Sequence, residues 1–157
     1  MQSLTDQSSQ TAQYATFYCG KAVLGLDIQC VQEINRTTSI TRVPLSPPCV
    51  RGVMNLRGEV VTMLDLRTLM GLPPAECTKN SRNLILKFDG EIFGLWVDGV
   101  ADILAISEAE ISAPPSNISI ADSRMIRGVY QQEGNLVMLV NPAELLAVSL
   151  SMTRSSD

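Results

Sequence analysis

A repeated segment constrains what this chain can fold into more than any other feature of its sequence. Residues 50–72 read VRGVMNLRGEVVTMLDLRTLMGL, and they align without a gap with residues 126–148, which read IRGVYQQEGNLVMLVNPAELLAV. Several matched positions carry the same residue: Arg51 and Arg127, Gly52 and Gly128, Gly58 and Gly134, and Leu69 and Leu145. Self-similarity of this kind indicates one supersecondary unit that the chain builds twice.

A second pair of segments shows that the repeat begins earlier in each unit. Residues 23–34 read VLGLDIQCVQEI and resemble residues 93–103, which read FGLWVDGVADI. The matched positions are Gly25 and Gly94, Val31 and Val100, and Ile34 and Ile103. We therefore expect two units, at about 16–72 and 84–148. Because a repeat in sequence need not be a separate body in space, a strand from one unit could complete the other.

Turn residues divide both units into short strands. The dipeptides Gly20-Lys21 and Asp89-Gly90 each separate two β-prone runs, and Asp-Gly favours the tight turns of hairpins. A further hairpin follows in each unit, with its turn near Gly58 or Gly134. Many short strands joined by glycine turns favour barrels or sandwiches. The sequence thus predicts a mainly β fold, with two small SH3-like, five-stranded β-barrel subdomains and short helices.

Short helices and loose ends complete the predicted layout. Asp65 precedes LRTLMG and Asn141 precedes PAELL, so each residue is placed at a helix N-cap. Pro142 then occupies the first helical position, where proline is favoured. The expected organisation is a flexible segment at residues 1–13, one domain at 14–148 made of two intertwined subdomains, and a flexible tail at 149–157.

The composition argues against several classes of function. A formal net charge of −4 without a basic stripe does not favour nucleic acid as a partner. No apolar run approaches the roughly 18 to 20 residues that cross a bilayer, so we expect a cytoplasmic protein without direct membrane insertion. The chain has no histidine, the commonest general base, and its carboxylates form no recognisable acid–base constellation. We therefore expect neither an enzyme nor a cofactor.

Four cysteines raise a separate possibility. Cys19, Cys30, Cys49 and Cys77 form no CxxC pair, and no histidine is present to complete a mixed zinc site. We interpret them as small apolar residues or free thiols, and we expect no metal site. A thiol-based metal or redox protein remains an alternative hypothesis.

The repeat separates scaffold from candidate function in the hairpin around Gly58. Gly58 and Gly134 hold the same place, so we interpret both as residues that the turn requires. Arg57 instead matches Glu133, which means that the hairpin tolerates either charge. Two interpretations of Arg57 stay open: a solvated charge at a turn, or a projecting donor for a carboxylate of a partner.

The VQEI segment contains a similar choice. Val31 and Ile34 match apolar residues of the second unit, so we expect both in a shared core. Glu33 matches Asp102, and it is either a solvated acid near a strand end or an acid that orients a docking helix. The methionines in or beside the predicted hairpins are expected to fill the core: Met54, Met63, Met70, Met125 and Met138.

The motifs taken together resemble one known family. In order they read GLDIQCVQEI, TRVPLSPPCVRGVMNLRGEVVTMLDLR, FGLWVDGVADIL and IRGVYQQEGNLVMLVN, and they span about Tyr14 to Val148. This combination is similar to CheW, the family of coupling proteins in bacterial chemotaxis arrays. The NLRG motif followed by V-x-x-L-D-L-R is the most specific part of the resemblance.

The resemblance implies a non-catalytic adaptor of two SH3-like barrels. Such an adaptor joins the regulatory domain of a CheA-type histidine kinase to the cytoplasmic tip of methyl-accepting chemoreceptors. By resemblance, the expected receptor-binding residues are Val31, Glu33, Asn55, Arg57 and Gly58. The expected kinase-binding surface includes Phe93, Leu95 and Val97.

Alternatives to this function remain. The same pattern occurs in adaptors of other kinase pathways, such as those of twitching motility. A hydrolase with paired carboxylates is a further alternative from another class, although no such pair can be placed in the sequence.

Overall fold

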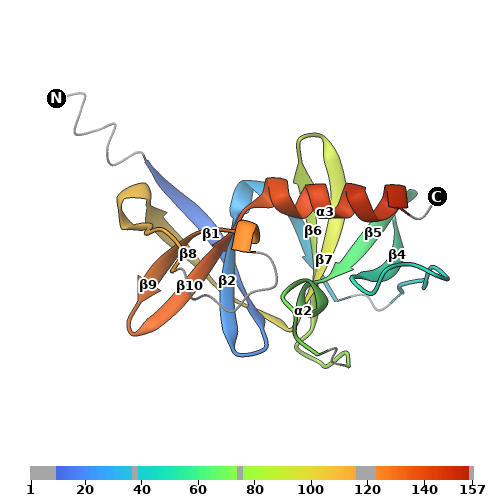
Figure 1. The fold of residues 1–157 in the computed structure, drawn as a ribbon, viewed down its shortest axis with the longest axis horizontal. Helices are drawn as coiled ribbons and strands as arrows, with labels where there is room; N and C mark the ends of the chain where they lie inside the picture. Colours follow the sequence, from blue (N-terminus) through green and yellow to red (C-terminus); the bar gives the residue numbers. More distant parts are fainter. Residues whose placement is uncertain (1–9, 37–38, 74–75, 116–122, 156–157) are drawn as a thin grey trace.

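The computed structural model describes residues 10–36, 39–73, 76–115 and 123–155. These residues form two five-stranded sheets, which lie side by side in Figure 1. The first sheet has the order β8 (Gly99–Ser107), β1 (Thr11–Cys19), β2 (Ala22–Asp27), β10 (Asn135–Val140) and β9 (Ile126–Gln132). The second has the order β3 (Val31–Asn35), β6 (Arg82–Phe88), β7 (Glu91–Val97), β5 (Glu59–Asp65) and β4 (Val50–Leu56). The predicted mainly β class is confirmed.

Helices occupy the connections and the C-terminal end. The described residues include the α-helices α2 (Leu66–Leu69) and α3 (Pro142–Ser155), and α3 runs from the first sheet across the second (Figure 1). Single 3-10 turns are η1 (Ile28–Cys30), η2 (Glu108–Glu110) and η3 (Ser123–Met125). Within the described ranges, no helix is both long and apolar enough to span a membrane.

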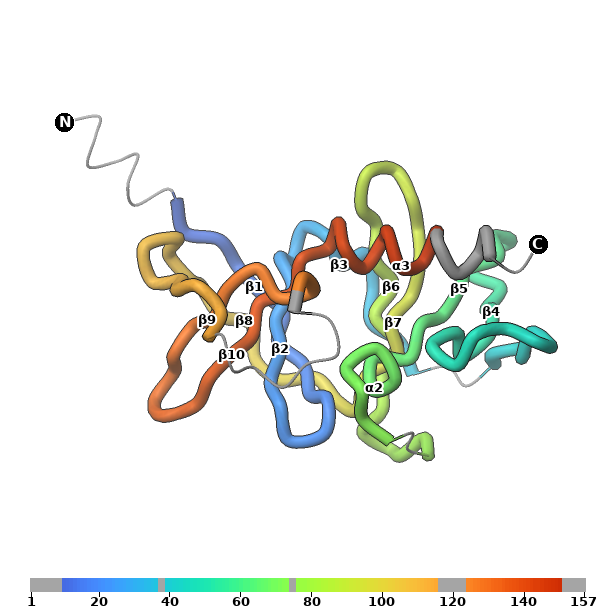
Figure 2. Tube along the Cα trace, in the orientation of Figure 1, coloured from blue at the N-terminus to red at the C-terminus, as the bar shows by residue number. Residues whose placement is uncertain are grey.

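The two repeat units exchange their first hairpins. Hairpin β1–β2 of the first unit completes the sheet of β8, β9 and β10, and hairpin β6–β7 of the second unit completes the sheet of β3, β4 and β5. In each sheet, one parallel strand pair connects the exchanged hairpin to the strands of the other unit. Leu139 of β10 lies opposite Gly25 of β2, and Met63 of β5 lies opposite Gly94 of β7. The path of the tube in Figure 2 shows both crossings. Neither sheet therefore belongs to one continuous half of the chain.

The hairpin turns have the conformation that the sequence predicts. Positive φ at both central residues characterises type I′ turns, which fit the twist of adjoining strands. This conformation occurs at three turns: Arg57 and Gly58 (φ 50° and 90°), Asp89 and Gly90 (54° and 80°), and Glu133 and Gly134 (45° and 85°). Arginine and glutamate thus adopt the same backbone at equivalent turns.

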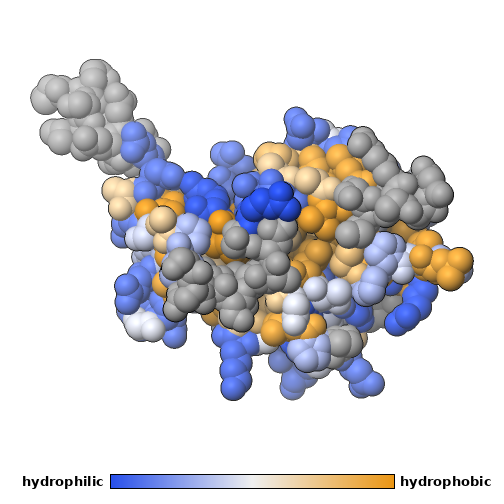
Figure 3. All heavy atoms as spheres, in the orientation of Figure 1, coloured by the Kyte–Doolittle hydropathy of each residue, from blue (hydrophilic) through white to orange (hydrophobic). Residues whose placement is uncertain are grey.

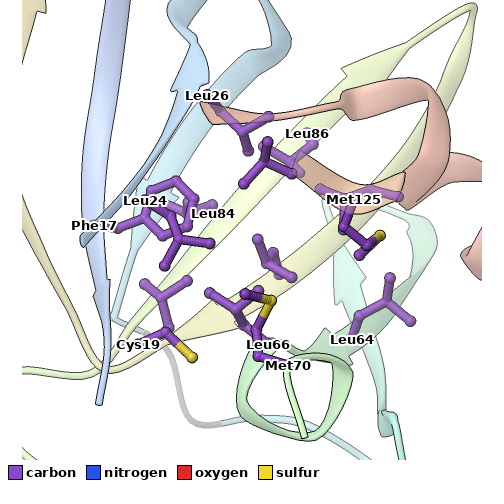
Figure 4. Close-up of a cluster of buried hydrophobic side chains, with 14 of the residues drawn as sticks. Phe17, Cys19, Leu24, Leu26, Leu64, Leu66, Met70, Leu84, Leu86 and Met125 are labelled. Carbon is purple, nitrogen blue, oxygen red and sulfur yellow. The ribbon is translucent and has the colours of Figure 1, made fainter. Parts of the chain in front are cut away.

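A shared apolar core lies between the two sheets. Figure 4 shows side chains from both sheets, α2 and the segment before β9 pointing toward one another: Phe17, Cys19, Leu24, Leu26, Leu64, Leu66, Met70, Leu84, Leu86 and Met125. Met54 and Met63 are also buried, and Met138 packs against the shared core. The prediction that the methionines fill the core is confirmed.

Strand β7 corrects one predicted binding surface. The exposed fractions of Phe93, Leu95 and Val97 are only 1%, 0% and 0%, and all three belong to the shared core. The expected kinase-binding surface is therefore wrong for these side chains. The physical reason is that β7 is an inner strand of its sheet, so these residues pack inside the molecule.

The edge strands correct a second prediction. Ile34 is 45% exposed, although we expected it in the shared core, and its counterpart Ile103 is 55% exposed. Val100, the counterpart of Val31, is 37% exposed. Their strands, β3 and β8, are sheet edges, so side chains there lie at the rim of the core. Val31 is half-buried and packs against the shared core, as expected.

Parts of both expected flexible ends lie in regular secondary structure. Thr11–Gln13 lie in β1, within the expected flexible segment, whereas residues 1–9 fall outside the described ranges. Asn141 caps α3 as predicted, since its Oδ1 accepts from the Ala143 amide at 3.0 Å. The helix then continues through the expected tail, where Ser149 is buried and Leu150 packs against the core. Residues 156–157 lie outside the described part.

Candidate protein-binding site

The β4–β5 hairpin presents the arginine of the NLRG motif. Asn55 Oδ1 accepts a hydrogen bond from the Gly58 amide at 3.0 Å, which closes the turn with a side chain. Asparagine favours this local bond, and glycine favours the positive φ that follows. The side chain of Arg57 is 71% exposed at this turn. Two residues of the motif therefore shape the turn, and the arginine projects from it.

A β-bulge directs Glu33 toward the same hairpin. Val31 pairs with Leu86 and Glu33 pairs with Ile85, so two residues of β3 oppose one residue of β6. Directly paired residues point to the same face of a sheet. Leu86 lies in the shared core, whereas Ile85 lies in a smaller cluster with Met54, Val61 and Met63. The bulge consequently places Val31 and Glu33 on opposite faces of the second sheet.

An ion pair joins the two motifs. Arg57 Nη2 lies 2.5 Å from Glu33 Oε1, although the residues are 24 positions apart in sequence. Glu33 Oε2 accepts from Asn35 Nδ2 at 3.1 Å, and Asn35 Oδ1 accepts from Asn83 Nδ2 at 3.1 Å. The pKa of Glu33 is held below its ordinary value chiefly by the hydrogen bond from Arg57, and to a smaller extent by the hydrogen bond from Asn35. The site is thus a charged, hydrogen-bonded cluster at the end of a hairpin.

The structure brings together four of the five residues predicted for receptor binding. Glu33, Asn55, Arg57 and Gly58 form the ion-pair cluster just described. Val31 is not part of it, because the bulge turns this side chain to the shared core. Asn35 and Asn83 were missed by the sequence reasoning, since no motif marks a residue that only supports a neighbour.

The second repeat shows what the fold itself requires at this hairpin. Glu133 and Asp102 occupy the places of Arg57 and Glu33, and both are exposed. Two carboxylates cannot form an ion pair with each other at neutral pH. Because the second hairpin folds with the same turn and no such pair, the Arg57–Glu33 pair is not a requirement of the fold.

The cysteines do not form a second site in the described part of the chain. Cys19, Cys30 and Cys49 are buried free thiols, and Cys77 is exposed. Burial raises the pKa of Cys19 to about 12, and it also raises the pKa values of Cys30 and Cys49. Thiolates react and bind metals, so these three thiols are poorly suited to either role. Among the described residues, no group of three potential ligands gathers around a metal-sized site.

Known proteins share the fold of this chain and show its family. The model of the CheW-like domain family matches residues 13–149. A chemotaxis protein CheW of Rhizobium meliloti is 34% identical over 124 residues, which cover 79% of this chain and 80% of the relative. Protein FrzA of Myxococcus xanthus is 28% identical over 145 residues, covering 91% and 90% of the two chains.

A solved structure shares the fold as well. The scaffolding protein TtCheW of Thermoanaerobacter tengcongensis has a TM-score of 0.78 and 29% sequence identity, and the match covers 83% of this chain and 84% of that one. The shared fold, together with the family match, places this chain in a class of scaffold proteins. The chain belongs to the CheW-like domain family, a family of non-catalytic scaffold proteins.

Proposed function

We propose that this protein couples a CheA-type histidine kinase to the cytoplasmic tip of methyl-accepting chemoreceptors. It acts in the cytoplasm and is recruited to receptor arrays at the membrane. Family membership and the names of the relatives support the chemotaxis assignment. The observation that carries the proposal for this chain is the exposed Arg57–Glu33 pair, which the fold does not need.

The chemistry of the pair suits a helical partner. A receptor tip is a helical hairpin, and helices dock on protein surfaces through apolar contacts with charged groups that fix the register. The side chain of Arg57 is 71% exposed, and its guanidinium group has donors beyond the one bound to Glu33. It can therefore hold Glu33 and accept a carboxylate of the partner at the same time.

Binding of the wild-type protein is the first test of this function. Calorimetric titrations are made against the kinase regulatory domain and, separately, against a soluble receptor tip, both from the same genome. We expect binding to both partners. Binding to neither would contradict the proposal. A different result would be binding to a kinase of another pathway, such as twitching motility, and not to the CheA-type kinase. That result would assign the protein to the other pathway.

A charge-swapped variant tells whether Arg57 contacts the partner directly. Arg57→Glu combined with Glu33→Arg restores an ion pair within the chain but reverses its direction. If Arg57 itself meets the receptor, the double variant binds as weakly as Arg57→Glu alone. Full recovery of receptor affinity would instead show that only the internal pair is needed.

A further inference from the structure

A second ion pair lies where the two sheets meet, and it involves the arginine of the LDLR motif. Arg67 Nη1 is 2.8 Å from Asp98 Oδ2, and Arg67 Nε donates to the carbonyl oxygen of Pro73 at 2.8 Å. The same Asp98 oxygen accepts from the Gly20 amide at 2.6 Å, and the Asp98 amide donates to the Tyr18 carbonyl oxygen at 3.0 Å. The two side chains are only 17% and 21% exposed.

These bonds cross the boundary between the sheets. Tyr18 and Gly20 belong to β1 and its turn in the first sheet, whereas Arg67 lies in α2, directly after β5 of the second sheet. Asp98 is the one residue between β7 of the second sheet and β8 of the first. The pair therefore joins α2 to a crossover and to the opposite sheet.

The pair also lies beside a cleft between the sheets. Asp98 lines a cavity of about 410 Å³, together with Tyr18 and Val100 of the first sheet and Arg82 of the second. Tyr18 and Val100 are 42% and 37% exposed there. The shape of this cleft depends on how the sheets are oriented relative to each other.

The repeat shows that the crossover folds without this pair. In the equivalent crossover, from β2 to β3, Gln29 takes the place of Asp98, and Ala143 takes the place of Arg67. Neither side chain carries a charge. The crossover from β2 to β3 has a local hydrogen bond instead, in which the Gln29 amide donates to Asp27 at 2.9 Å. The Arg67–Asp98 pair is thus an addition on one side of a nearly symmetric scaffold.

A charged hydrogen bond between the sheets is directional, whereas the apolar contacts of the shared core are not. Apolar contacts hold surfaces together, but they define the relative orientation of two packed sheets less strictly than a hydrogen bond does. A hydrogen-bonded ion pair has a defined geometry and is stronger when it is partly removed from water. Asp98 is further fixed by two backbone bonds to the first sheet.

We infer that Arg67 and Asp98 are positioning residues that set the orientation of the two sheets, and through it the geometry in which the scaffold holds its partners. This inference rests on the proposed coupling function. The pair acts without contacting either partner. It determines whether kinase and receptor, each bound normally, are held so that the receptor controls the kinase.

Residual dipolar couplings of the full chain test the orientation directly. The couplings of the two sheets are fitted separately. In the wild type, the two fits should give the same alignment tensor. The variant Asp98→Asn keeps the shape and an acceptor for the Gly20 amide but removes the charge, so its sheets should give two different tensors. A single tensor in this variant, as in the wild type, would contradict the inference.

Receptor-dependent kinase activation in a reconstituted assembly tests the consequence. For Asp98→Asn we expect each separate affinity, for kinase and for receptor tip, to stay within about twofold of wild type, while activation falls at least about fivefold. Arg67→Met, which keeps the aliphatic stem, should behave in the same way. The control Glu108→Gln breaks the 2.8 Å pair with Arg127, which joins η2 to β9 of the first sheet and does not reach the second sheet. It should leave activation unchanged.

The outcomes separate this inference from the proposed function. If the wild type binds neither partner, the proposed function fails. If the wild type couples them and Asp98→Asn couples them equally well, only the positioning role is wrong. If both variants lose their separate affinities together with stability, the pair is simply structural and the inference is also overturned.

Discussion

At the scale of single residues, the same backbone carries different chemistry in the two repeats. Arg57 and Glu133 adopt similar left-handed conformations at equivalent turns, so the turn does not select the side chain. Exposed ion pairs contribute little to stability, because water and salt screen them and the long side chains lose freedom. Folding therefore does not account for the Arg57–Glu33 pair, which is consistent with the proposed role in binding a partner.

The titration of Glu33 reports whether the pair forms in solution. Its pKa is lowered chiefly by the hydrogen bond from Arg57. A carboxylate with a lowered folded-state pKa stabilises the fold above its unfolded-state pKa, and this contribution is lost as the pH falls through the folded-state pKa. In Arg57→Ala, we expect the pKa of Glu33 to rise toward its ordinary value of 4.5, as measured by NMR of the carboxyl carbon. An unchanged pKa would show that the pair does not form in solution.

At the scale of elements, α3 is the most important addition to the two sheets. Leu145 is fully buried in the shared core, and Leu146 is 8% exposed. The helix contacts β6 and β7 of the second sheet although it follows β10 of the first. On the face shown in Figure 3, hydrophobic residues gather around α3 and the β6–β7 hairpin. The helix therefore covers the second sheet and ties it to the first.

Truncation of a helix residue measures this contribution. We expect Leu145→Ala to lower the free energy of unfolding by about 2–5 kcal/mol, because it leaves a cavity in a close-packed core. The matched control is Leu136→Ala, in β10, where the side chain is 43% exposed and the loss should be at most about 0.5 kcal/mol. Chemical denaturation gives both values. Equal losses in the two variants would mean that α3 does not complete the core.

At the scale of the whole molecule, the exchanged hairpins make the two halves interdependent. A fragment that contains only the first unit has β1 and β2 of the first sheet. It also has β3, β4 and β5 of the second sheet, but it lacks β6 and β7. Two isolated strands are marginally stable in water. A fragment that ends before β6 should therefore be unfolded by itself, as should its complement.

Fragment complementation checks this interdependence. We expect fragments 1–76 and 77–157 to give disordered NMR spectra separately and a folded spectrum when they are mixed. The exchanged hairpins then supply each sheet with its missing strands. A fragment that folds alone would show that each sequence repeat is an independent domain.

Whether a feature could be predicted from the sequence depends on how far apart in the chain the interacting residues lie. Turns and caps depend on neighbouring residues, so Asp89-Gly90 and Asn141 were predictable from sequence. The exposure of Ile34 depends on which strands form the sheet edges, which local patterns do not encode. The burial of Leu95 on an inner strand has the same origin.

The candidate site follows the same rule. The motifs marked Arg57 and Glu33 separately, but only the bulge in β3 brings them together. No motif marked Asp98 as a functional residue, because its partner Arg67 is 31 positions away in sequence. Long-range ion pairs of this kind become visible only in the folded structure.

Receptor-tip affinity and melting temperature, measured together for Arg57→Glu and Glu133→Arg, test the central claim most directly. Each variant places at one hairpin the charge that the equivalent hairpin carries. We expect both to melt within about 4 °C of wild type, and only Arg57→Glu to lose receptor affinity, by at least about tenfold. If Arg57→Glu unfolds, or if both variants bind the receptor tip as the wild type does, Arg57 is not the residue that couples this scaffold to its receptor.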